Sequence, residues 1–341
     1  MNDLLTDEAY QVYILAGVSR TFALTIPQLP PALCQVVGNG YLLCRIADTI
    51  EDEPALTPEQ KQYFSQQFIN VVAGHTSPDS FSQALEPLLS AVTLDAEKEL
   101  VRNTPRVINI TRNFNAIQQA ALLRCVQVMA VGMADFQQQA TLQGLKTVAD
   151  IDRYCYCVAG VVGEMLTTLF CDYSPKIAKN AEKLQKLSIS FGQGLQMTNI
   201  LKDIWDDHKR GACWLPREVF TRLGFELSEL SAINHGKQFQ TGVGELIVIA
   251  CQHLEQALNY TLLIPRQEQG VRRFCLYALG MAVLTLRKIN QQRNFTSGKQ
   301  VKISRTQVKF VVILSNVLGY SNMGLRAVFS LFTRQLRNAN K

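Results

Sequence analysis

The chain has 341 residues, of which 47% are hydrophobic and 18% are charged, and its formal net charge is +6. This is the composition of a globular protein with enough apolar residues for a large core. The positive charge is modest and dispersed, and no basic stripe is interleaved with aromatic residues. The sequence therefore lacks the usual pattern of a nucleic-acid-binding protein.

Cysteine usage and the N-terminus indicate the compartment. The nine cysteines are scattered through apolar segments. Their spacing does not match a zinc site, so we expect buried, reduced thiols of a cytoplasmic protein. The N-terminus lacks a signal-peptide pattern. The sequence has no run of 18 or more apolar residues, so we expect no helix that spans a membrane.

Helices are predicted along most of the chain, because the segments are long, rich in Leu, Ala and Gln, and poor in alternating β-branched runs. In chain order, proline and glycine breaks fall near residues 27–31, 54–58, 74–78, 175, 210–216, 267–270 and 294–298. Helices are expected at about residues 154–170, with Asp150 and Asp152 as caps, and at about residues 176–205. The one plausible extended piece is residues 300–303. The sequence therefore predicts an all-α bundle in a single domain over residues 1–341.

Two segments each carry three acidic residues at positions i, i+3 and i+4. The two triads are Asp48, Glu51 and Asp52, and Asp203, Asp206 and Asp207. On a helix this spacing puts the three carboxylates on one face, where like charges repel. A hard cation such as Mg²⁺ relieves the repulsion and bridges carboxylates to phosphate oxygens. The triads therefore predict metal sites for a phosphorylated substrate, with a solvated acidic face as the alternative.

Each triad continues upstream as a polar stripe on an otherwise apolar helix. The stripes are Tyr41, Arg45, Asp48 and Asp52, and Gln196, Asn199, Asp203 and Asp207. Such a stripe faces either solvent or a polar cavity inside a bundle. Two triads, each with an amide or an arginine upstream on the same face, favour the metal site.

The two acidic segments resemble the aspartate-rich motifs of squalene and phytoene synthases. Further segments resemble that family in the same order along the chain, at residues 19–23, 132–136, 154–163 and 210–216. The resemblance covers about residues 15–220. It implies an isoprenoid-synthase fold, a single large helical bundle in which the two motifs face each other across a central cavity.

The resemblance also implies roles for single residues. The expected ligands of Mg²⁺, or alternatively Mn²⁺, are Asp48, Glu51, Asp52, Asp203 and Asp207. The residues expected to bind the substrate diphosphates are Ser19, Arg20, Thr21, Arg45, Gln196, Asn199, Lys202 and Arg210. The expected catalytic residues are Tyr41, Arg45, Tyr154 and Phe274. The tyrosines would bind the departing diphosphate or assist proton transfer, unless they are core residues, and Phe274 would shield a carbocation from water.

Two glycines stand inside the predicted helix of the Val-Ala-Gly segment. At Gly160 and Gly163, glycine costs about 1 kcal/mol relative to alanine. Close approach of either a prenyl chain or a neighbouring helix would account for them.

The implied reaction is the head-to-head condensation of two allylic diphosphates through a cyclopropyl intermediate. Squalene synthases reduce the final cation with NADPH, whereas phytoene and dehydrosqualene synthases lose a proton. Residues 273–282 and 301–305 resemble squalene-synthase segments, although Ala278, Leu279 and Ser304 depart from the eukaryotic pattern. We therefore expect a squalene synthase that uses farnesyl diphosphate, with a phytoene or dehydrosqualene synthase as the alternative. The residues expected to bind NADPH are Asn199, Lys202, Lys302 and Arg305.

Two other classes are less well supported. A non-catalytic assembly protein of the same fold would have lost acids from the motifs, and both motifs are intact. A head-to-tail prenyltransferase usually carries Asp-Asp-x-x-Asp, where residues 48–52 read Asp-Thr-Ile-Glu-Asp.

The C-terminal residues 323–341 are predicted to form a basic amphipathic helix in place of the membrane helix of eukaryotic squalene synthases, so the resemblance is to the bacterial type. Its apolar face consists of Leu325, Val328, Phe329, Phe332 and Leu336. This pattern suits an interfacial helix on anionic lipid, with a helix docked on the protein core as the alternative. We therefore expect a cytoplasmic monomer, peripheral to the inner face of the membrane.

Overall fold

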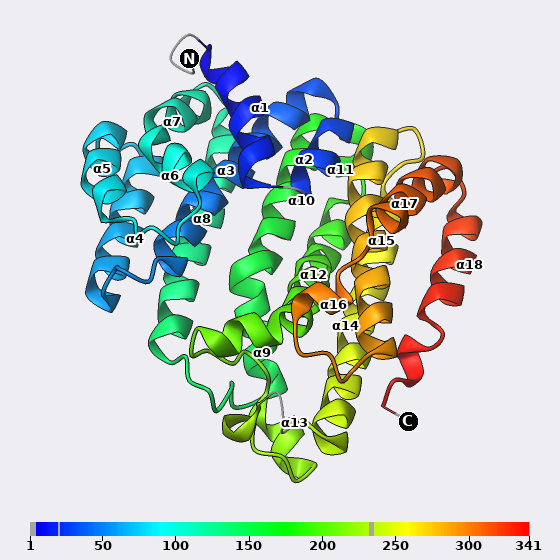
Figure 1. Cartoon of the computed structure of the whole chain (residues 1–341). Coiled ribbons are helices and arrows are strands. Elements are labelled where there is room, and N and C mark those ends of the chain that lie inside the picture. Colours follow the sequence, from blue (N-terminus) through cyan, green and yellow to red (C-terminus); the bar gives the residue numbers. More distant parts are fainter. Residues whose placement is uncertain (1–4, 20, 232–234, 341) are drawn as a thin grey trace. The chain divides into compact units, whose positions relative to one another are not determined.

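The computed structural model describes residues 5–19, 21–231 and 235–340. These residues form helices of several types and no β-strand, and one isolated bridge joins Leu145 and Pro216 (Figure 1). The all-α prediction is confirmed. The residues cluster into two compact units, Met1–Gln138 with Glu164–Ala181, and Gln139–Gly163 with Glu182–Lys341. The single domain over residues 1–341 stays a prediction.

The first unit is built around α3 and α8, which pack on each other, with α4 also packed on α8. Its helices are α1 (Asp7–Val18), α2 (Phe22–Thr25), α3 (Pro31–Asp52), α4 (Pro58–Val72), α5 (Pro78–Leu85), α6 (Asp95–Arg102), α7 (Thr104–Arg112), α8 (Ala116–Gln138), most of α10 (Val161–Tyr173) and α11 (Pro175–Ala178). The predicted proline breaks start several of them, because proline fits the first turn of a helix. At α4, Thr57 and Gln60 also form a capping box.

Helix α3 is buried around most of its circumference. Leu42, Leu43, Ile46 and Ile50 are fully excluded from solvent. Asn39 is also buried, and its amide nitrogen donates to the carbonyl of Val107 at 2.9 Å. The remaining stripe of α3 is the one that carries the predicted polar residues.

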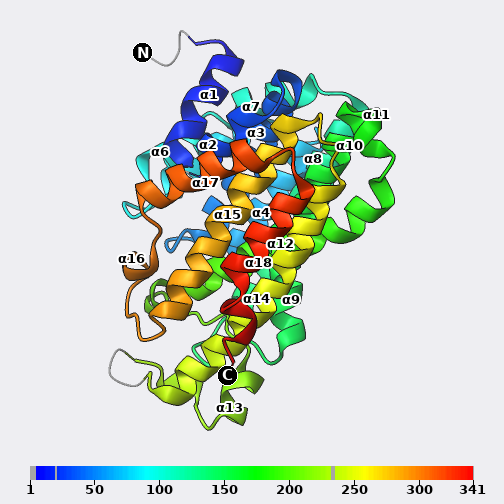
Figure 2. The same ribbon diagram turned by 90° about the vertical axis from the view of Figure 1, so that its right-hand side faces the viewer.

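The second unit contains α9 (Val148–Cys155), the π-helix η4 (Tyr156–Gly160), α12 (Ala181–Lys209), α13 (Arg217–Arg222), α14 (Lys237–Leu263), α15 (Gln269–Gln291), α16 (Gly298–Val301), α17 (Arg305–Leu318) and α18 (Asn322–Thr333). Helix α15 contacts α14, α17 and α18, and Figure 2 shows α18 running alongside α14. Helix α15 is therefore the centre of the C-terminal part of this unit.

Three predicted elements differ in detail from the structure. Thr147 is the N-cap of α9, and Asp150 completes its capping box, so the predicted caps were placed too late. The extended piece predicted at residues 300–303 is only partly observed, because Ser297 caps the short helix α16, which continues to Val301, and the extended backbone begins at Lys302. The predicted C-terminal helix ends earlier, with α18 ending at Thr333 and a 3-10 turn following at Leu336–Asn338.

The apolar face predicted for the C-terminal helix is largely docked on the protein. Leu325 and Phe329 are 7% exposed and Leu336 is fully buried, and α18 contacts α14, α15 and α17. The alternative of a terminal helix packed on the core is therefore the observed one for this face.

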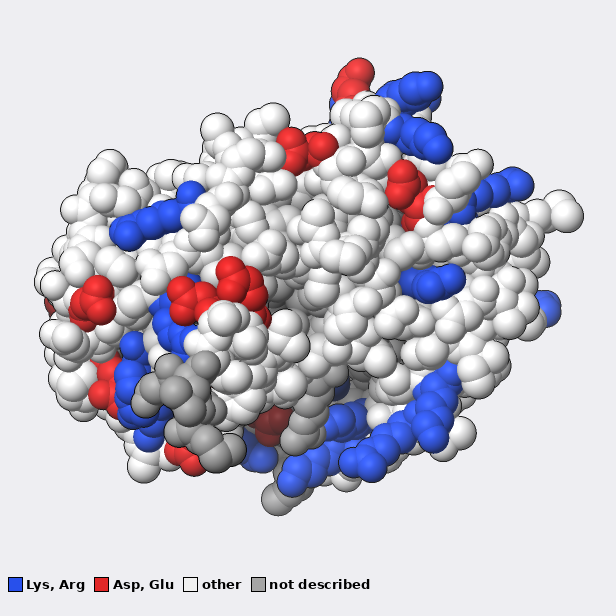
Figure 3. Space-filling model, turned by 90° about the horizontal axis from the view of Figure 1, so that it is seen from above, with Lys and Arg blue, Asp and Glu red and all other residues white. Residues whose placement is uncertain are grey.

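Two helical segments, Ala116–Gln138 and Val148–Tyr173, are long and apolar enough to cross a membrane by length and composition. Their apolar windows are 39% and 44% buried inside the protein. Buried core helices have the same composition, so this finding does not by itself indicate a membrane span. On the face shown in Figure 3, charged side chains stand in small groups separated by uncharged surface.

A single buried arginine ties the helices of the second unit together. Arg272 on α15 is fully buried. It donates to the carbonyls of Ile264 and Gly319 at 2.7 Å and of Thr261 at 3.2 Å. It also donates to the side-chain oxygen of Asn322 at 2.8 Å. These acceptors lie at the ends of α14 and α17 and the start of α18, where helix-end carbonyls need donors from outside.

We expect Arg272→Met to lower the free energy of unfolding by about 3 kcal/mol or more, because it leaves buried carbonyls without donors. The free energy of unfolding of Arg272→Lys should lie between those of the unmodified protein and Arg272→Met, because one ammonium cannot reach all four acceptors. The measurement is urea unfolding followed by circular dichroism. The exposed Arg266→Met is the matched control and should change stability by no more than about 0.5 kcal/mol. Equal effects at both positions would contradict the assigned role.

Candidate active site

The first acidic segment lies on the polar stripe of α3. The Arg45 guanidinium is 3.8 Å from the Asp48 carboxylate and 3.6 Å from that of Glu97 on α6. Arg45 also donates to the Tyr41 hydroxyl at 3.1 Å, and Tyr41 donates to the Val18 carbonyl at 3.1 Å. The structure therefore joins three of the predicted residues in one network. Sequence reasoning missed Glu97, since nothing in its local sequence links it to α3.

The pKa of Asp48 in this network is unusual for a carboxylate. Burial raises the pKa of Asp48 to about 6; the nearby Arg45 opposes the rise, and the charges of Asp52 and Glu97 add to it. The pKa of Arg45 is also raised: burial lowers it, but the negative neighbours outweigh the burial. The stripe thus holds more negative charge than its single arginine neutralises.

Glu51 points toward a different neighbour. Its carboxylate accepts a hydrogen bond from Gln137 of α8, and Lys61 of α4 donates to its backbone carbonyl. Glu51 lines a pocket between α4 and α8 with Ala130 and Ala134. Burial and the charge of Asp52 raise the pKa of Glu51 to about 8. Its role as a metal ligand stays a prediction.

The segment before α2 lies next to Tyr41. Ser19 is buried, and its hydroxyl accepts a hydrogen bond from the backbone N–H of Phe22 at 2.9 Å. The ring of Phe22 is 5.0 Å from that of Tyr41. Thr21 is exposed. Arg20 lies outside the described residues.

The second acidic segment lies near the C-terminal end of α12, where each aspartate has a local cation. The Lys202 ammonium is 3.0 Å from Asp203 and 3.5 Å from the amide oxygen of Asn199. Arg210 is 2.6 Å from the buried Asp207. Lys209 lies 3.6 Å from the exposed Asp206. Gln196 is half-buried one turn before Asn199.

The loop after α15 packs directly against this acidic segment. The Trp205 indole donates to the Phe295 carbonyl at 2.7 Å. A Cβ at Gly298 would stand 3.0 Å from the Lys202 carbonyl and 3.3 Å from the Asp203 carboxylate. Sequence reasoning missed both contacts, although the small residues before Lys302 were a signal of close approach.

Lys302 and Arg305 follow this loop and are exposed. The Lys302 carbonyl accepts from Lys288 at 2.6 Å. Ser304 forms the capping box of α17 with Gln307, which gives a structural reason for the serine that departs from the eukaryotic pattern. The loop therefore leads from the Asp203 carboxylate toward two basic residues.

Tyr154 and Phe274 are both buried. The ring of Tyr154 stacks on that of Trp214 at 4.3 Å with a 9° interplanar angle. Tyr154 lies two residues before the start of η4, and π-helical turns are frequent at functional sites. The catalytic roles of Tyr154 and Phe274 stay predictions.

Close helix packing accounts for the mid-helix glycine at position 163. A Cβ at Gly163 would stand 2.2 Å from the Ser188 carbonyl of α12. A Cβ at Gly192 of α12 would stand 2.1 Å from the Ala159 carbonyl. At Gly160 the nearest atom is a side-chain carbon of Tyr156 at 2.9 Å. Of the two predicted explanations, the neighbouring helix is the one observed at Gly163.

The described residues contain no group of three or more His, Cys, Asp or Glu side chains placed to hold a metal ion by themselves. Mg²⁺ commonly uses one or two carboxylates, keeps several waters and takes the remaining oxygens from substrate phosphates. The carboxylate pairs on α3 and α12 fit that mode. The pKa of Asp48, raised mainly by burial and further by the charges of Asp52 and Glu97, marks a place where a cation would stabilise the ionised carboxylate.

Comparison with known families shows which family this chain belongs to. Residues 15–307 match the family model described as squalene/phytoene synthase. The chain belongs to this family. The match confirms the predicted family. Members of this family are prenyltransferase-type enzymes.

Curated relatives cover most of the chain. Squalene synthase R6 from Phoma sp. is 31% identical over 307 residues, covering 86% of this chain and 67% of the relative. Squalene synthase clz20 from Cochliobolus lunatus is 29% identical over 336 residues, covering 96% and 75%.

Solved structures share the fold. TcSQS in complex with a ligand has a TM-score of 0.75 at 24% identity and covers 97% of this chain and 91% of that chain. A dehydrosqualene synthase in complex with a ligand has a TM-score of 0.65 at 23% identity, covering 91% and 95%. The predicted isoprenoid-synthase fold is confirmed by these likenesses.

The end of α3 depends on a buried carboxylate next to the family's first acidic motif. Glu53 is 1% exposed and accepts hydrogen bonds from Thr93 at 2.5 Å, Ala55 at 2.9 Å and the Ser90 backbone at 3.0 Å. Burial alone raises its pKa, but these hydrogen bonds outweigh burial and hold the pKa below its usual value. A depressed pKa gives stability above the unfolded-state pKa, and this stability is lost as pH falls through the folded-state pKa.

We expect Glu53→Gln to lower the free energy of unfolding at pH 7 by about 1–3 kcal/mol. The difference from the unmodified protein should shrink as pH falls through the lowered pKa of Glu53, because the wild-type carboxyl then becomes protonated too. Urea unfolding across pH measures both effects. The exposed Glu8→Gln removes the same charge and serves as the control. A loss that is independent of pH would contradict this account.

Proposed function

We propose that the protein is a squalene synthase that condenses two farnesyl diphosphates head to head through presqualene diphosphate and then reduces this intermediate with NADPH. Curated relatives described as squalene synthases, 26–31% identical to this chain, support the proposal. The observation that carries it is the repeated pairing of carboxylate with fixed cation on two acidic helices. Arg45 stands beside Asp48, Lys202 beside Asp203, and Arg210 beside Asp207.

Diphosphate binding would use both charge types. Bound Mg²⁺ would neutralise the diphosphate and assist its departure. Its ligands would be Asp48, Asp52, Asp203 and Asp207, with Glu51 as a further candidate and Mn²⁺ as a substitute. Arg45 would contact phosphate oxygens with a guanidinium already oriented by Tyr41 and Glu97, which lowers the ordering cost of binding. The other proposed diphosphate contacts are Ser19, Arg20, Thr21, Gln196, Asn199, Lys202 and Arg210.

Two further tasks fall to aromatic residues. Tyr41, whose hydroxyl already accepts from Arg45, would stay close to the departing diphosphate. Tyr154 and Phe274 would help keep water from a reacting carbocation, since both are buried.

The reductive half would use a basic region in the second unit. The proposed NADPH-binding residues are Asn199, Lys202, Lys302 and Arg305. The proposal is supported by the contact of Gly298 with Lys202 and Asp203 and by the exposure of Lys302 and Arg305 shortly after it. Exposed lysine and arginine side chains are suited to the phosphates of a dinucleotide.

The decisive experiment is incubation of the purified protein with farnesyl diphosphate, with and without Mg²⁺ and NADPH, followed by mass spectrometry of extracted products. Squalene formed only with both additions is the expected result. Dehydrosqualene or presqualene diphosphate as the end product, whether or not NADPH is present, would overturn the reductive half alone. Absence of any product from farnesyl diphosphate would overturn the proposal.

Neighbouring aspartates on α12 allow a matched test of the metal assignment. We expect Asp203→Asn to slow diphosphate release by about 10²-fold and to raise the Mg²⁺ concentration needed for half-maximal rate. Asp206→Asn removes the same charge three residues later from an exposed side chain and should keep nearly full activity. Pyrophosphate release at varied Mg²⁺ measures both. Equal losses in the two variants would indicate a general effect of negative charge and contradict the assignment.

A further inference from the structure

The second unit has one outer surface rich in exposed apolar side chains. Among its described residues, every large hydrophobic side chain that is exposed lies on α17, α18 or the turn between them. These side chains are Phe310 (44% exposed), Ile313 (63%), Val317 (69%), Tyr320 (57%), Met323 (83%) and Leu331 (68%). Single exposed hydrophobic residues are ordinary, but such a concentration marks an interaction surface.

The spacing of these residues explains their common direction. Phe310, Ile313, Val317 and Tyr320 recur every three or four positions and so share one face of α17 and its C-terminal turn. The opposite face of α17 is buried through Val311 and Ser315. The exposed stripe is therefore not a misplaced core face, because α17 already has its core contact with α15.

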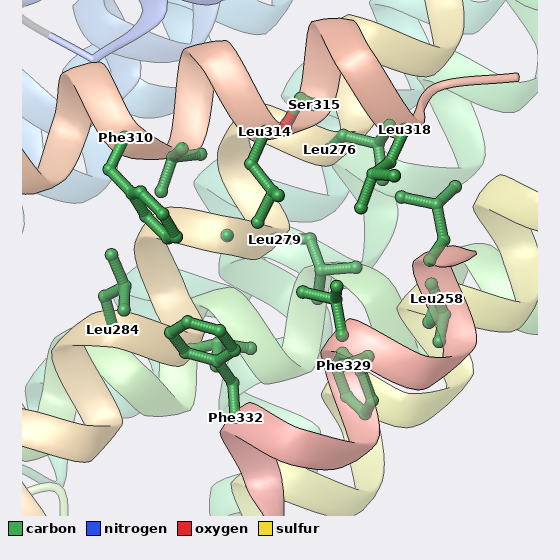
Figure 4. Close-up of a pocket in the computed structure, with 15 residues that line it drawn as sticks. Leu258, Leu276, Leu279, Leu284, Phe310, Leu314, Ser315, Leu318, Phe329 and Phe332 are labelled. Carbon is green, nitrogen blue, oxygen red and sulfur yellow. The ribbon is translucent and has the colours of Figure 1, made fainter. Parts of the chain in front are cut away.

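An apolar groove opens beside this stripe. It lies between α15, α17 and α18, and Figure 4 shows its aliphatic and aromatic lining. Phe310 of α17 and Phe332 of α18 contribute to the lining, and their rings are 5.9 Å apart. Because Phe310 is also exposed, the groove and the stripe form one continuous apolar surface. We call the exposed stripe and this groove the α17–α18 surface.

Helices α17 and α18 themselves carry only basic charged residues. Glu268 is the last acidic residue of the chain, and residues 269–341 contain thirteen Lys and Arg and no Asp or Glu. Lys309, Arg326 and Arg334 are exposed on the same two helices or directly after them. The rest of the chain is therefore net negative, although the whole carries +6. The neighbouring acid Glu255 of α14 is paired with Arg337 at 3.3 Å. A surface that joins apolar side chains to an excess of cations complements an extended anionic surface with an apolar interior.

We propose that the α17–α18 surface docks on an anionic lipid bilayer. Ile313, Val317 and Met323 enter the boundary between headgroups and acyl chains, Tyr320 stays at the interface, and the basic residues contact lipid phosphates. The docking face is different from the one that the amphipathic pattern of residues 323–341 predicts, because Leu325, Phe329 and Leu336 of that face are buried. The proposal does not depend on which reaction the enzyme catalyses.

Vesicle co-sedimentation tests the two components of the surface separately. The full chain should bind vesicles of phosphatidylcholine mixed with phosphatidylglycerol and bind pure phosphatidylcholine at least about tenfold more weakly. The double variant Lys309→Glu with Arg334→Glu should lose about tenfold or more in affinity for the anionic vesicles. The double variant Ile313→Ser with Val317→Ser should lose a similar factor.

The control is Ile117→Ser in the first unit, where the same residue type is 54% exposed. It should bind anionic vesicles as the unmodified chain does. None of these substitutions touches a residue assigned to the reaction, so activity in vesicle-free solution should stay unchanged. Retained activity also shows that the variants are folded.

A tryptophan reporter tests insertion directly. The two native tryptophans, Trp205 and Trp214, are 5% and 6% exposed and should respond little to lipid. Ile313→Trp should shift its emission to the blue with anionic vesicles and be quenched by brominated acyl chains, whereas Ile117→Trp should show neither change.

Three outcomes would overturn the proposal. One is equal binding to neutral and anionic vesicles. Another is unchanged binding by both double variants. The third is a concentration-dependent dimer in sedimentation velocity that Ile313→Ser abolishes, without any vesicle binding, because a second copy of the chain would then cover the surface.

Discussion

The proposed chemistry of this protein depends on one structural constraint, which is that a largely apolar helix carries carboxylates along a single stripe. Helix α3 buries Leu42, Leu43, Ile46 and Ile50 on its other sides, so its orientation is fixed by the core and its stripe cannot rotate away. The stripe then crowds acidic groups together, and Arg45 is the cation held among them by Tyr41, Asp48 and Glu97. Rigid packing thus maintains an electrostatic arrangement that the carboxylates alone would not favour.

Helix α12 also carries an acidic stripe, and close backbone contacts fix its orientation. Gly192 and Gly163 let α12 approach the η4 region so closely that a methyl group would collide with a carbonyl at either position. Trp205 and Gly298 then hold the loop after α15 against the acidic end of α12. The acids of α12 therefore have neighbours from distant parts of the second unit, while Lys202, Lys209 and Arg210 neutralise them locally.

The sequence predicted those features that depend on local spacing. The polar stripes of α3 and α12 follow from positions three and four residues apart, and several of the predicted proline breaks fall at helix starts. Contacts between residues far apart in the chain were not predictable in this way. Glu97 reaches Arg45 only because α6 packs on α3. Ser304 looked like a departure from a binding motif, yet it caps α17.

The C-terminal helices show why an amphipathic pattern alone does not identify a lipid-facing side. Periodicity correctly separated Leu325 and Phe329 from the basic residues, but a regular apolar stripe is equally what a helix needs to pack on its own protein. Only burial distinguishes the two uses, and α18 buries these residues.

The raised pKa of Asp48 links the fold to the proposed chemistry through the sign of its effect on stability. A carboxyl whose folded-state pKa is raised to about 6 favours the folded protein when protonated, and this contribution is lost as pH rises through that value. Near neutral pH the folded chain therefore carries an ionised carboxylate that destabilises it. A bound cation would offset this penalty in the folded state alone, because the unfolded chain neither buries Asp48 nor keeps it close to Asp52 and Glu97. The proposed metal affinity and the local destabilisation at this stripe would thus both follow from the same buried carboxylate.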